Sequence, residues 1–227
     1  MNIVITGASR GIGYQVAKLF SENKDNKIIA ISRNKENLEI LQKESDNIIS
    51  IPFDLSSNQY SDLIHQISNS IDKVDILINN AGHLINKPFK DISHNEMNDI
   101  FNVNFFSVAL LIQDLLPLMN INSHIVNIGS MGGFQGSSKF PGLAVYSASK
   151  AALANLSECL AEELKEQKIS VNCLSIGSVQ TEMLESAFPG YQAPLQADEM
   201  ASFIVDFALT GHKFFNGKVL PVSSTTP

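Results

Sequence analysis

The sequence Thr6-Gly7-Ala8-Ser9-Arg10-Gly11-Ile12-Gly13 decides the fold of this chain. It directly follows the apolar run Ile3-Val4-Ile5 and opens a segment of helical period, so we expect it to join a first strand to a first helix. Glycines in such a turn let the backbone approach a pyrophosphate, which the free N–H groups and dipole of the helix N-terminus attract. The same glycines also fit a plain tight turn, but their place at the start of a strand-helix-strand pattern favours a dinucleotide site.

Beyond this turn, short β-branched runs alternate with longer segments of helical period. Such alternation predicts a parallel sheet with helices on both faces. Runs such as Asp75-Ile76-Leu77-Ile78 are continuously apolar, which is typical of strands that are covered on both sides. We therefore expect an α/β protein with a Rossmann-like, doubly wound sheet in a single dinucleotide-binding and catalytic domain, residues 1–227. Its strands are expected near residues 2–6, 27–31, 48–51, 74–78, 124–128, 169–175 and 218–222.

Two later segments have the apolar spacing of helices with one buried face. One follows His94 and the other follows Tyr146. In the segment 182–197, by contrast, prolines and a glycine break any regular pattern, and we expect a mobile substrate loop there. The apolar positions of the two helices are Val108, Leu111, Ile112 and Leu115 in the first, and Leu153, Leu156, Leu160 and Leu164 in the second.

Composition and charge exclude several classes of partner. The chain has 227 residues, of which 44% are hydrophobic, and its formal net charge of −7 disfavours nucleic acid and anionic membrane surfaces. It shows neither a signal-peptide pattern nor a long unbroken apolar run, and Cys159 and Cys173 have no paired spacing, so a cytoplasmic location is expected. The histidines lack metal-ligand spacing, so we expect no metal site and surface or capping roles for them. They are His65, His83, His94, His124 and His212.

The end of the second expected strand bears on the choice of dinucleotide. A fold of this kind that prefers NAD carries an acidic residue there, whereas this chain has Ser32-Arg33. A guanidinium favours the 2′-phosphate of NADP(H) through planar, charge-assisted contacts. The chain has only two arginines, Arg10 and Arg33, against fourteen lysines, and both lie beside the expected site. A lysine-biased composition can leave arginines there by chance, but their shared position favours NADP(H) as the cofactor.

The ordered motifs resemble those of the classical short-chain dehydrogenases/reductases over essentially the whole chain. They are TGASRGIG at 6–13, Asp54 after the third strand, NNAG at 79–82, Asn104, Ser130 and YSASK at 146–150. The resemblance implies seven parallel strands and no separate substrate domain. It also implies that Asp54 meets the adenine amino group and that Asn80 and Gly82 line the ribose. The implied cofactor-binding residues are Gly7, Ser9, Arg10, Gly11, Ile12, Gly13, Ser32, Arg33, Asp54, Leu55, Asn80, Ala81, Gly82, Tyr146, Lys150, Gly177, Val179 and Thr181.

The chemistry of carbonyl reduction points to Tyr146 and Lys150 as well. Hydride transfer to a carbonyl leaves an oxyanion that needs a proton from a nearby acid. Tyr146 is the expected acid, and its pKa must fall from the ordinary value near 10 for exchange near neutrality. Lys150 lies four positions further along the same helix, where its ammonium can stabilise the phenolate. Without the other motifs, the same pair would fit two exposed side chains on a helix.

Ser130 and Asn104 complete the expected catalytic set. Ser130 follows an apolar strand, so its hydroxyl is expected at the carboxyl edge of the sheet, where it can hydrogen-bond the substrate oxygen. A serine in a Gly-Ser turn is also often structural. Asn104 interrupts an apolar helix, and the matching residue in the family holds a water that links the lysine to solvent. An asparagine that faces solvent is the alternative, which the apolar neighbours Val103, Phe105 and Phe106 disfavour.

Three features depart from the family pattern. Ile176-Gly177 stands where the family has Pro-Gly, while Val179 and Thr181 still match the residues that hold the nicotinamide carboxamide. The stretch 131–145 is a few residues longer than usual. Ser223-Ser224 stands where an acidic residue and glycines are common. These differences bear on the shape of the pocket and on subunit contacts more than on the chemistry.

We therefore predict an NADP(H)-dependent oxidoreductase that acts on a ketone, an aldehyde or a secondary alcohol, with Tyr146 as general acid/base. A non-catalytic NADP(H)-binding sensor or scaffold is the alternative, and nucleic-acid binding is a third that the net charge disfavours. The two apolar helices resemble those through which the family pairs subunits, so a homodimer or homotetramer is expected. The sequence leaves the substrate open, because its candidate pocket residues also fit ordinary loop packing. They are Met131, Phe134, Phe140, Leu143, Met183, Leu184 and Phe188.

Overall fold

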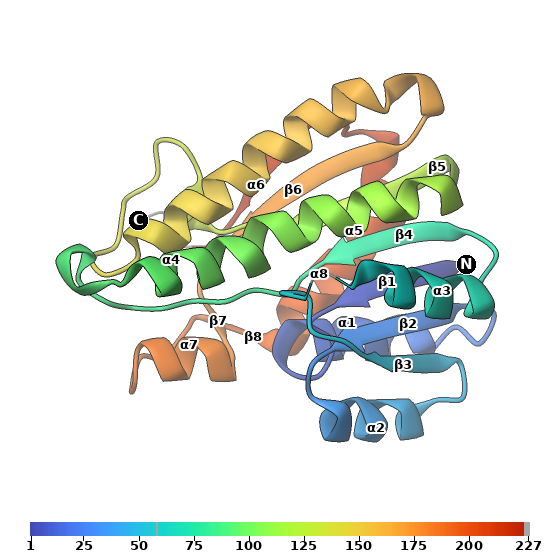
Figure 1. The fold of residues 1–227 in the computed structure, drawn as a ribbon, viewed down its shortest axis with the longest axis horizontal. Coiled ribbons are helices and arrows are strands. Elements are labelled where there is room, and N and C mark those ends of the chain that lie inside the picture. The colour runs from blue at the N-terminus through green and yellow to red at the C-terminus, as the bar shows by residue number, and fades with distance from the viewer. Residues whose placement is uncertain (58, 225–227) are drawn as a thin grey trace.

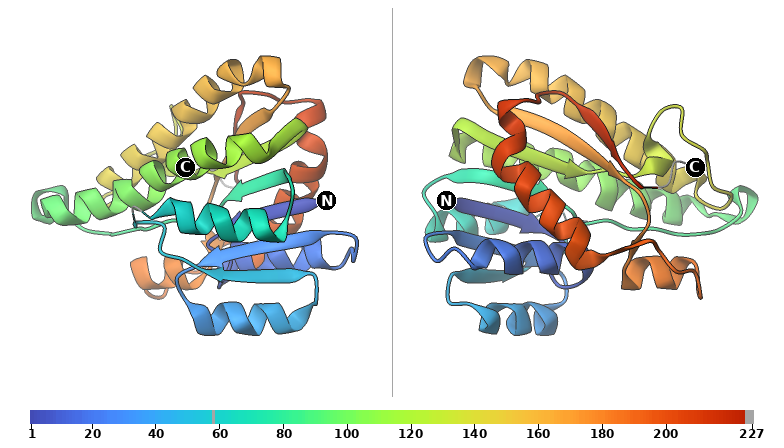
Figure 2. Two further views of the ribbon diagram at one scale, coloured as in Figure 1. Left: turned by 45° about the vertical axis from the view of Figure 1, so that its right-hand side comes forward. Right: turned by 180° about the vertical axis from the view of Figure 1, so that it is seen from behind.

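A computed structural model describes residues 1–57 and 59–224 of the chain. At its centre is a seven-stranded parallel sheet in the order β3-β2-β1-β4-β5-β6-β9, with helices on both faces (Figures 1 and 2). This arrangement confirms the predicted fold class. The strands lie within one residue of their predicted bounds, except that the fifth begins at Met119 and not near residue 124. The strands are β1 Asn2–Thr6, β2 Lys27–Ser32, β3 Ile48–Pro52, β4 Val74–Asn79, β5 Met119–Ile128, β6 Ser170–Ile176 and β9 Val219–Val222.

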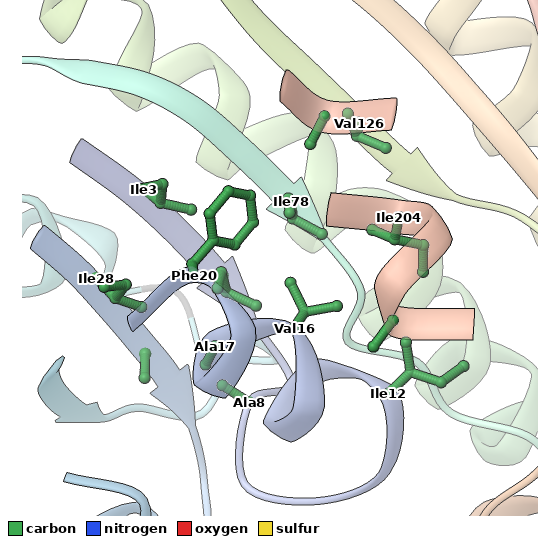
Figure 3. Packing of buried hydrophobic residues seen from close by; sticks show 14 of the residues in the cluster. Ile3, Ala8, Ile12, Val16, Ala17, Phe20, Ile28, Ile78, Val126 and Ile204 are labelled. Carbon is green, nitrogen blue, oxygen red and sulfur yellow. The ribbon is translucent and has the colours of Figure 1, made fainter. Parts of the chain in front are cut away.

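The helices divide between the two faces of the sheet because alternate residues of each strand point in opposite directions. Ile3 and Ile5 of β1 join a core cluster with α1, α2 and α8, whereas Val4 joins a second cluster with α3, α5 and α6. Figure 3 shows Val16 and Phe20 of α1 in the first cluster. The helices are α1 Gly11–Ser21, α2 Lys35–Glu44, α3 Tyr60–Ser70, α4 His94–Phe101, α5 Ser107–Leu115, α6 Ala144–Glu163, α7 Glu182–Ala187 and α8 Ala197–Thr210.

The strand order reverses between β1 and β4, which places a crevice at the carboxyl ends of these two strands. The turn after β1, the loop after β4 and the segment after β5 all leave the sheet at this edge. The fold therefore brings the glycine turn, the NNAG motif and Ser130 to one side of the molecule. Short 3₁₀ turns also occur, at Phe89–Asp91, Leu116–Leu118, Met131–Gly133, Lys165–Gln167 and Gly211–Lys213.

The helical stretch from α4 to α5 contains a π-helical turn, Asn102–Phe106. By length and composition alone, the stretch His94–Leu118 is sufficient to cross a membrane, a property that it shares with core helices of globular proteins. One side of it packs on the sheet, and Phe106 and Leu110 are exposed on the other. The residues predicted to form its buried side are all buried, namely Val108, Leu111, Ile112 and Leu115. In α6, Leu153 and Leu164 are buried, and Leu156 and Leu160 are partly buried.

The segment after β6 is more regular than the sequence suggests. The expectation that prolines and a glycine break any regular pattern over 182–197 is wrong, because α7 begins at Glu182 and β8 Leu195–Gln196 pairs with β7 Val179–Gln180. The interrupting residues, Pro189 to Pro194, lie between α7 and β8. The mobility of this segment stays a prediction.

One histidine departs from the expectation of surface or capping roles. His124 lies within β5 and is 1% exposed. Its two ring nitrogens lie 3.0 Å from the Ala208 carbonyl oxygen and 3.0 Å from Asn172 Nδ2. Burial lowers the pKa of His124 to about 4, so the ring is neutral at pH 7. A buried imidazole is stable here because both of its nitrogens have partners.

Candidate active site

The glycine turn at the end of β1 is shaped by two close approaches. Gly7 has a φ of +69°, and a Cβ at this position would lie 2.8 Å from the Ala81 Cα. A Cβ at Gly13 would overlap the Gly7 carbonyl oxygen and Asn80 Nδ2. Only glycine fits both positions without a shift of the backbone, so the turn stays compact and its N–H groups remain close to the crevice.

The NNAG motif holds this turn from the side of β4. The Thr6 hydroxyl oxygen accepts hydrogen bonds from the backbone N–H groups of Asn80 and Ala81, both at 3.1 Å. In return, Asn80 Nδ2 donates to the carbonyl oxygens of Thr6 and Gly7, at 3.1 and 3.2 Å. Asn80, Ala81 and Gly82 also line the cavity described below, so the motif both fixes the turn and borders the site.

Two arginines border the same region. Arg10 and Arg33 are exposed and line the cavity together with Ser9 and Ser32. The hydroxyl oxygens of the two serines lie 2.8 Å apart, which ties the glycine turn to the end of β2. This end of the cavity thus presents guanidinium and hydroxyl donors, which suit a phosphate group.

Asp54 lies close enough to Arg33 to be affected by its charge, and it is a charged hydrogen-bond acceptor. Its Oδ1 accepts hydrogen bonds from the Ser56 backbone N–H at 3.0 Å and the Ser56 hydroxyl at 2.8 Å. Burial raises the pKa of Asp54, but these hydrogen bonds and the Arg33 charge outweigh it, so the pKa lies below its usual value. The side chain is therefore a carboxylate at neutral pH, able to accept from an amino group.

Ser130, Tyr146 and Lys150 come together in another part of the cavity. Ser130 follows β5, and the other two lie one helical turn apart on α6. The Ser130 hydroxyl and the Tyr146 phenol form a hydrogen bond. Lys150 Nζ donates to the Ile128 carbonyl oxygen at 2.8 Å. A phenol, a hydroxyl and an ammonium thus share one wall.

Burial sets the direction of the pKa shifts in this group. It raises the pKa of Tyr146, and the hydrogen bond with Ser130 acts in the opposite direction. It lowers the pKa of Lys150 to about 8, opposed by the Cys173 thiol. The lowered Tyr146 pKa that the sequence predicts is therefore not the shift of this structure, because the cost of burying a phenolate dominates.

Asn104 is buried within the π-helical turn, so the alternative of a solvent-facing asparagine is wrong. Its Oδ1 accepts from the His83 backbone N–H at 2.7 Å, and its Nδ2 donates to the His83 carbonyl oxygen at 2.9 Å. Nδ2 also donates to the Ser149 hydroxyl at 2.9 Å, and Ser149 in turn donates to the Tyr146 carbonyl oxygen at 2.7 Å. Asn104 thereby connects the loop after β4 to the helix that carries Tyr146 and Lys150.

A cavity of about 820 Å³ unites most of the predicted residues. Gly13 and Asn104 do not line it, because Gly13 packs on Gly7 and Asn104 lies behind Gly82. The predicted residues that do line it are Gly7, Ser9, Arg10, Gly11, Ile12, Ser32, Arg33, Asp54, Leu55, Asn80, Ala81, Gly82, Ser130, Tyr146, Lys150, Gly177, Val179 and Thr181.

The cavity also has walls that sequence motifs did not reveal. Asn37 on the first turn of α2 follows the cap formed by Asn34, a pattern that a search for helix caps can find. Leu84 and Tyr191 lie in loops without any motif. Of the apolar candidates, Phe134 does not line the cavity, whereas the others do, namely Met131, Phe140, Leu143, Met183, Leu184 and Phe188.

The departure at Ile176-Gly177 is accommodated by close packing. The Gly177 N–H donates to the Val222 carbonyl oxygen at 2.8 Å, and a Cβ on Gly177 would lie 2.5 Å from Ser223 Oγ. The glycine is therefore required beside Ser223, which also lines the cavity. The chain thus keeps the glycine of the family's Pro-Gly pair and replaces only the proline.

These features fit a dinucleotide. The turn contains positions that a Cβ would fill, it leads into the N-terminus of α1, and two guanidinium groups lie beside it. The cavity continues from this turn to Tyr146 and Lys150, so one ligand can border both regions. We name the part around the glycine turn and Arg33 the cofactor end.

Comparisons with known proteins agree with this description. The family model for short chain dehydrogenases matches residues 1–192. An uncharacterised oxidoreductase of Staphylococcus aureus is 30% identical over 218 residues, which cover 94% of this chain and 92% of that protein. A fatty acyl-CoA reductase of Acinetobacter baylyi is 33% identical over 213 residues, which cover 89% of this chain and 70% of that protein.

A solved structure extends the agreement to three dimensions. The 3-ketoacyl-(acyl-carrier-protein) reductase of Brucella melitensis, complexed with NADH, has a TM-score of 0.87 and 26% identity, and the match covers 98% of this chain and 96% of that one. The sheet order, the glycine turn and the family match over residues 1–192 lead to one conclusion. The chain belongs to the short-chain dehydrogenase family of oxidoreductases.

Proposed function

We propose that the protein is an NADP(H)-dependent oxidoreductase that transfers hydride between the nicotinamide and a ketone, an aldehyde or a secondary alcohol. One observation carries this proposal: a single cavity is bordered by the glycine turn and Arg33 at its cofactor end and by Ser130, Tyr146 and Lys150 further along. The residues at the first end would hold the phosphates of a dinucleotide, and Tyr146 further along would supply the proton.

Tyr146 is the proposed general acid/base. When bound, the dinucleotide supplies or accepts the hydride. Tyr146 gives its proton to the carbonyl oxygen during reduction and takes it back during alcohol oxidation. The hydroxyl of Ser130, already hydrogen-bonded to the phenol, holds the substrate oxygen beside it. Lys150, with a pKa of about 8, is mostly an ammonium at pH 7 and stabilises the phenolate after proton transfer.

Asn104 is proposed to act indirectly. A Cβ on Gly82 would lie 3.6 Å from Asn104 Oδ1 and 3.7 Å from Lys150 Nζ, so the two polar groups lie close to the same point of the backbone. This proximity supports the predicted water link between them. The hydrogen bonds of Asn104 to His83 and Ser149 also support a positioning role for the loop and for α6.

The preference for NADP(H) rests on the charges at the cofactor end. Arg33 and Ser32 occupy the end of β2, where a carboxylate would repel a 2′-phosphate. Arg10 and Ser9 approach from the glycine turn, and Asn37 lies on the facing turn of α2. Two cations and several neutral donors favour the doubly charged phosphate of NADP(H) over the ribose hydroxyl of NAD(H).

A panel of aliphatic, aromatic, 3-oxoacyl and sugar carbonyls tests the function, with NADPH absorbance as the readout. We expect oxidation of NADPH with at least one class, and slower oxidation of NADH at equal concentration. Tight NADPH binding without oxidation by any carbonyl would support the alternative of a sensor or scaffold.

We also propose that copies of the chain pair through the α4–α5 stretch to form a homodimer or homotetramer. Phe106 is 51% exposed and Leu110 is 40% exposed on its outer side, where a partner would cover them. Light scattering at micromolar concentration should give at least twice the mass of 24.8 kDa, and a monomer mass contradicts the proposal. The free thiols of Cys159 and Cys173 support a cytoplasmic location, which cell fractionation can test.

A further inference from the structure

We propose that the substrate is an uncharged, apolar carbonyl compound that enters free of any carboxylate or phosphate-bearing carrier. This inference rests on the proposed function, because it names the substrate class of the same site. It concerns the part of the cavity that we name the substrate end. The residues that line this end are Leu84, Met131, Phe140, Leu143, Met183, Leu184, Phe188 and Tyr191.

Among the described residues that line the cavity, the charged ones are Arg10, Arg33, Asp54, Lys150 and Glu182. The arginines and Asp54 border the cofactor end. Glu182 Oε2 lies 3.5 Å from the position of a Cβ on Gly11, so this carboxylate also faces the glycine turn. Lys150 adjoins both parts, but its Nζ donates to the Ile128 carbonyl oxygen and is assigned to the phenolate. An anionic substrate group would therefore find no cation reserved for it among these residues.

Apolar side chains reach close to the proposed reaction centre. Met183 Cε lies 3.8 Å from the position of a Cβ on Gly82, and Lys150 Nζ lies 3.7 Å from the same point. At the rim, Phe140 is 41% exposed and Tyr191 is 48% exposed, so both rings can lose contact with water when a ligand binds. An apolar substrate is thus covered from the rim to a point close to the ammonium.

Two lysines on the neighbouring loops, Lys87 and Lys139, already have partners. Lys87 Nζ forms an ion pair with Glu96 at 3.0 Å, and Lys139 Nζ donates to the Phe134 carbonyl oxygen at 2.6 Å and the Ser137 hydroxyl at 2.8 Å. A carrier phosphate that bound either of these two lysines would have to displace these contacts. The formal net charge of −7 adds a general repulsion of polyanionic carriers.

The physical chemistry favours an apolar ligand strongly. Moving an unpaired carboxylate from water into an apolar site is costly, whereas each buried methylene improves transfer from water by about fourfold. A substrate chain that lies against methionine, leucine and phenylalanine side chains should therefore gain affinity with length and lose it with a terminal charge.

A matched pair of ligands tests this inference. Octan-2-one and 7-oxooctanoate have the same carbonyl and chain length, but one ends in a methyl group and the other in a carboxylate. We expect kcat/KM with NADPH to be at least about tenfold higher for octan-2-one, and to rise about fourfold per methylene from butan-2-one to octan-2-one. Calorimetric titration of both ligands into the NADPH-saturated protein should show the same order of affinity.

A positive charge introduced into the wall of the substrate end gives a second test of the inference. Leu184→Lys should narrow the preference for octan-2-one over 7-oxooctanoate by at least about tenfold, since the new ammonium pairs with the carboxylate. Leu184→Met preserves the apolar character and should keep the preference. Phe134→Ala, outside the cavity, should keep it as well.

The two proposals fail in different ways. Equal or tighter binding of 7-oxooctanoate, or equal turnover of both ligands, overturns the apolar-substrate inference and leaves the oxidoreductase function intact. Binding of octan-2-one in preference to 7-oxooctanoate, but without NADPH oxidation by any carbonyl, supports the inference about the site and contradicts the proposed reaction. Failure of both ligands to bind measurably also overturns the inference.

Discussion

The cofactor end and the substrate end of the same cavity are held by different kinds of contact. At the cofactor end, hydrogen bonds in both directions join Thr6 and Gly7 to Asn80 and Ala81, at 3.1 to 3.2 Å. The positions of Gly7 and Gly13 admit no side chain without a shift of their neighbours. Few other amino-acid types could make these hydrogen bonds or fit these glycine positions. The geometry of the cofactor end therefore requires particular amino acids.

The substrate end is assembled from three separate segments. The loop after β4 contacts α7 through a hydrogen bond from Asn86 Nδ2 to the Ala187 carbonyl oxygen at 2.9 Å. The same loop contacts the segment before α6 through the Lys87 N–H and the Gly142 carbonyl oxygen at 3.0 Å. The walls themselves are apolar side chains, which other apolar residues of similar volume can replace. The substrate end therefore requires no particular sequence motif and is harder to predict from the sequence.

The largest expected effect lies where the two ends meet, at Tyr146. Tyr146→Phe removes the proposed proton donor but keeps the ring, so reduction should fall by ~10²–10⁴-fold while NADPH binding stays nearly unchanged. Stopped-flow absorbance measures the chemical step, and fluorescence titration measures NADPH binding. Tyr14→Phe is the matched control, because its hydroxyl bonds Glu44 on the surface. Retention of more than a tenth of the rate, with chemistry still limiting, would mean that the proton comes from another group.

The next largest expected effect is on dinucleotide binding at the cofactor end. Arg33→Ala should weaken NADPH binding by about 10- to 100-fold, because a hydrogen bond to a charged group contributes roughly 1.5–3 kcal/mol. NADH binding should stay nearly constant, since NADH lacks the 2′-phosphate. Fluorescence titration with both dinucleotides measures the two dissociation constants.

Lys35→Ala is a suitable control for Arg33, because Lys35 is a nearby exposed cation that pairs with Glu39 at 3.8 Å and does not line the cavity. Arg10 is a less specific probe, since it lies on the glycine turn. Equal losses of NADPH and NADH affinity in Arg33→Ala would remove the main support for NADP(H) preference.

The dependence of kcat on pH tests the role of Lys150, which lies between the two ends of the cavity, without a mutation. With a Lys150 pKa of about 8, the ammonium share falls from about nine-tenths at pH 7 to about one-tenth at pH 9, so kcat for reduction should fall about tenfold.

The free energy of unfolding should rise over the same pH range in which kcat falls. The pKa of Lys150 in the folded protein lies below the ordinary lysine value of 10.5, so the unfolded chain binds more protons between pH 8 and 10.5. This group alone makes the free energy of unfolding rise across that window.

Urea unfolding at each pH separates the two effects of Lys150. A fall in kcat together with constant or rising stability agrees with loss of the ammonium charge. A flat kcat from pH 7 to pH 9 contradicts a requirement for that charge.

The contrast between the two ends also explains what the sequence could predict. The turn at 6–13 and Ser32-Arg33 require special backbone freedom or charge, and Ser32, Arg33 and most residues of the turn line the cavity. The sequence could not show whether Gly13 and Asn104 line the cavity or lie just behind it, because a motif indicates that a residue is required but not which atoms it contacts. Gly13 packs on Gly7, and Asn104 bonds His83 and Ser149.

Other features that the sequence did not predict depend on contacts between segments far apart in the chain. His124 is stable inside the sheet because Ala208 and Asn172, far away in sequence, supply its partners. Likewise, Leu84 and Tyr191 reach the cavity only because the loops that carry them fold over it. Single-sequence reasoning finds local turns and helix faces, but these pairings depend on the complete fold.

The smallest expected effect concerns the contact that joins two walls of the substrate end. Asn86→Ala removes the donor to the Ala187 carbonyl oxygen and leaves α7 held by fewer contacts. Since a neutral hydrogen bond contributes about 0.5–1.5 kcal/mol and Asn86 is exposed, KM for an apolar ketone should rise by about two- to tenfold. The NADPH dissociation constant should change by less than about twofold, because the cofactor end has its own hydrogen bonds.

Hydrogen exchange gives Asn86→Ala a second readout. Amides of α7 should exchange faster in the variant, while those of α1 keep their rates, since only the substrate end has lost a contact. Asn86→Asp preserves the side-chain shape but also lacks the N–H donor, so it should behave like Asn86→Ala if the hydrogen bond matters and like the wild type if only shape matters. An increase in the NADPH dissociation constant equal to the increase in KM would show that the two ends are coupled, and the distinction between them would then fail at this contact.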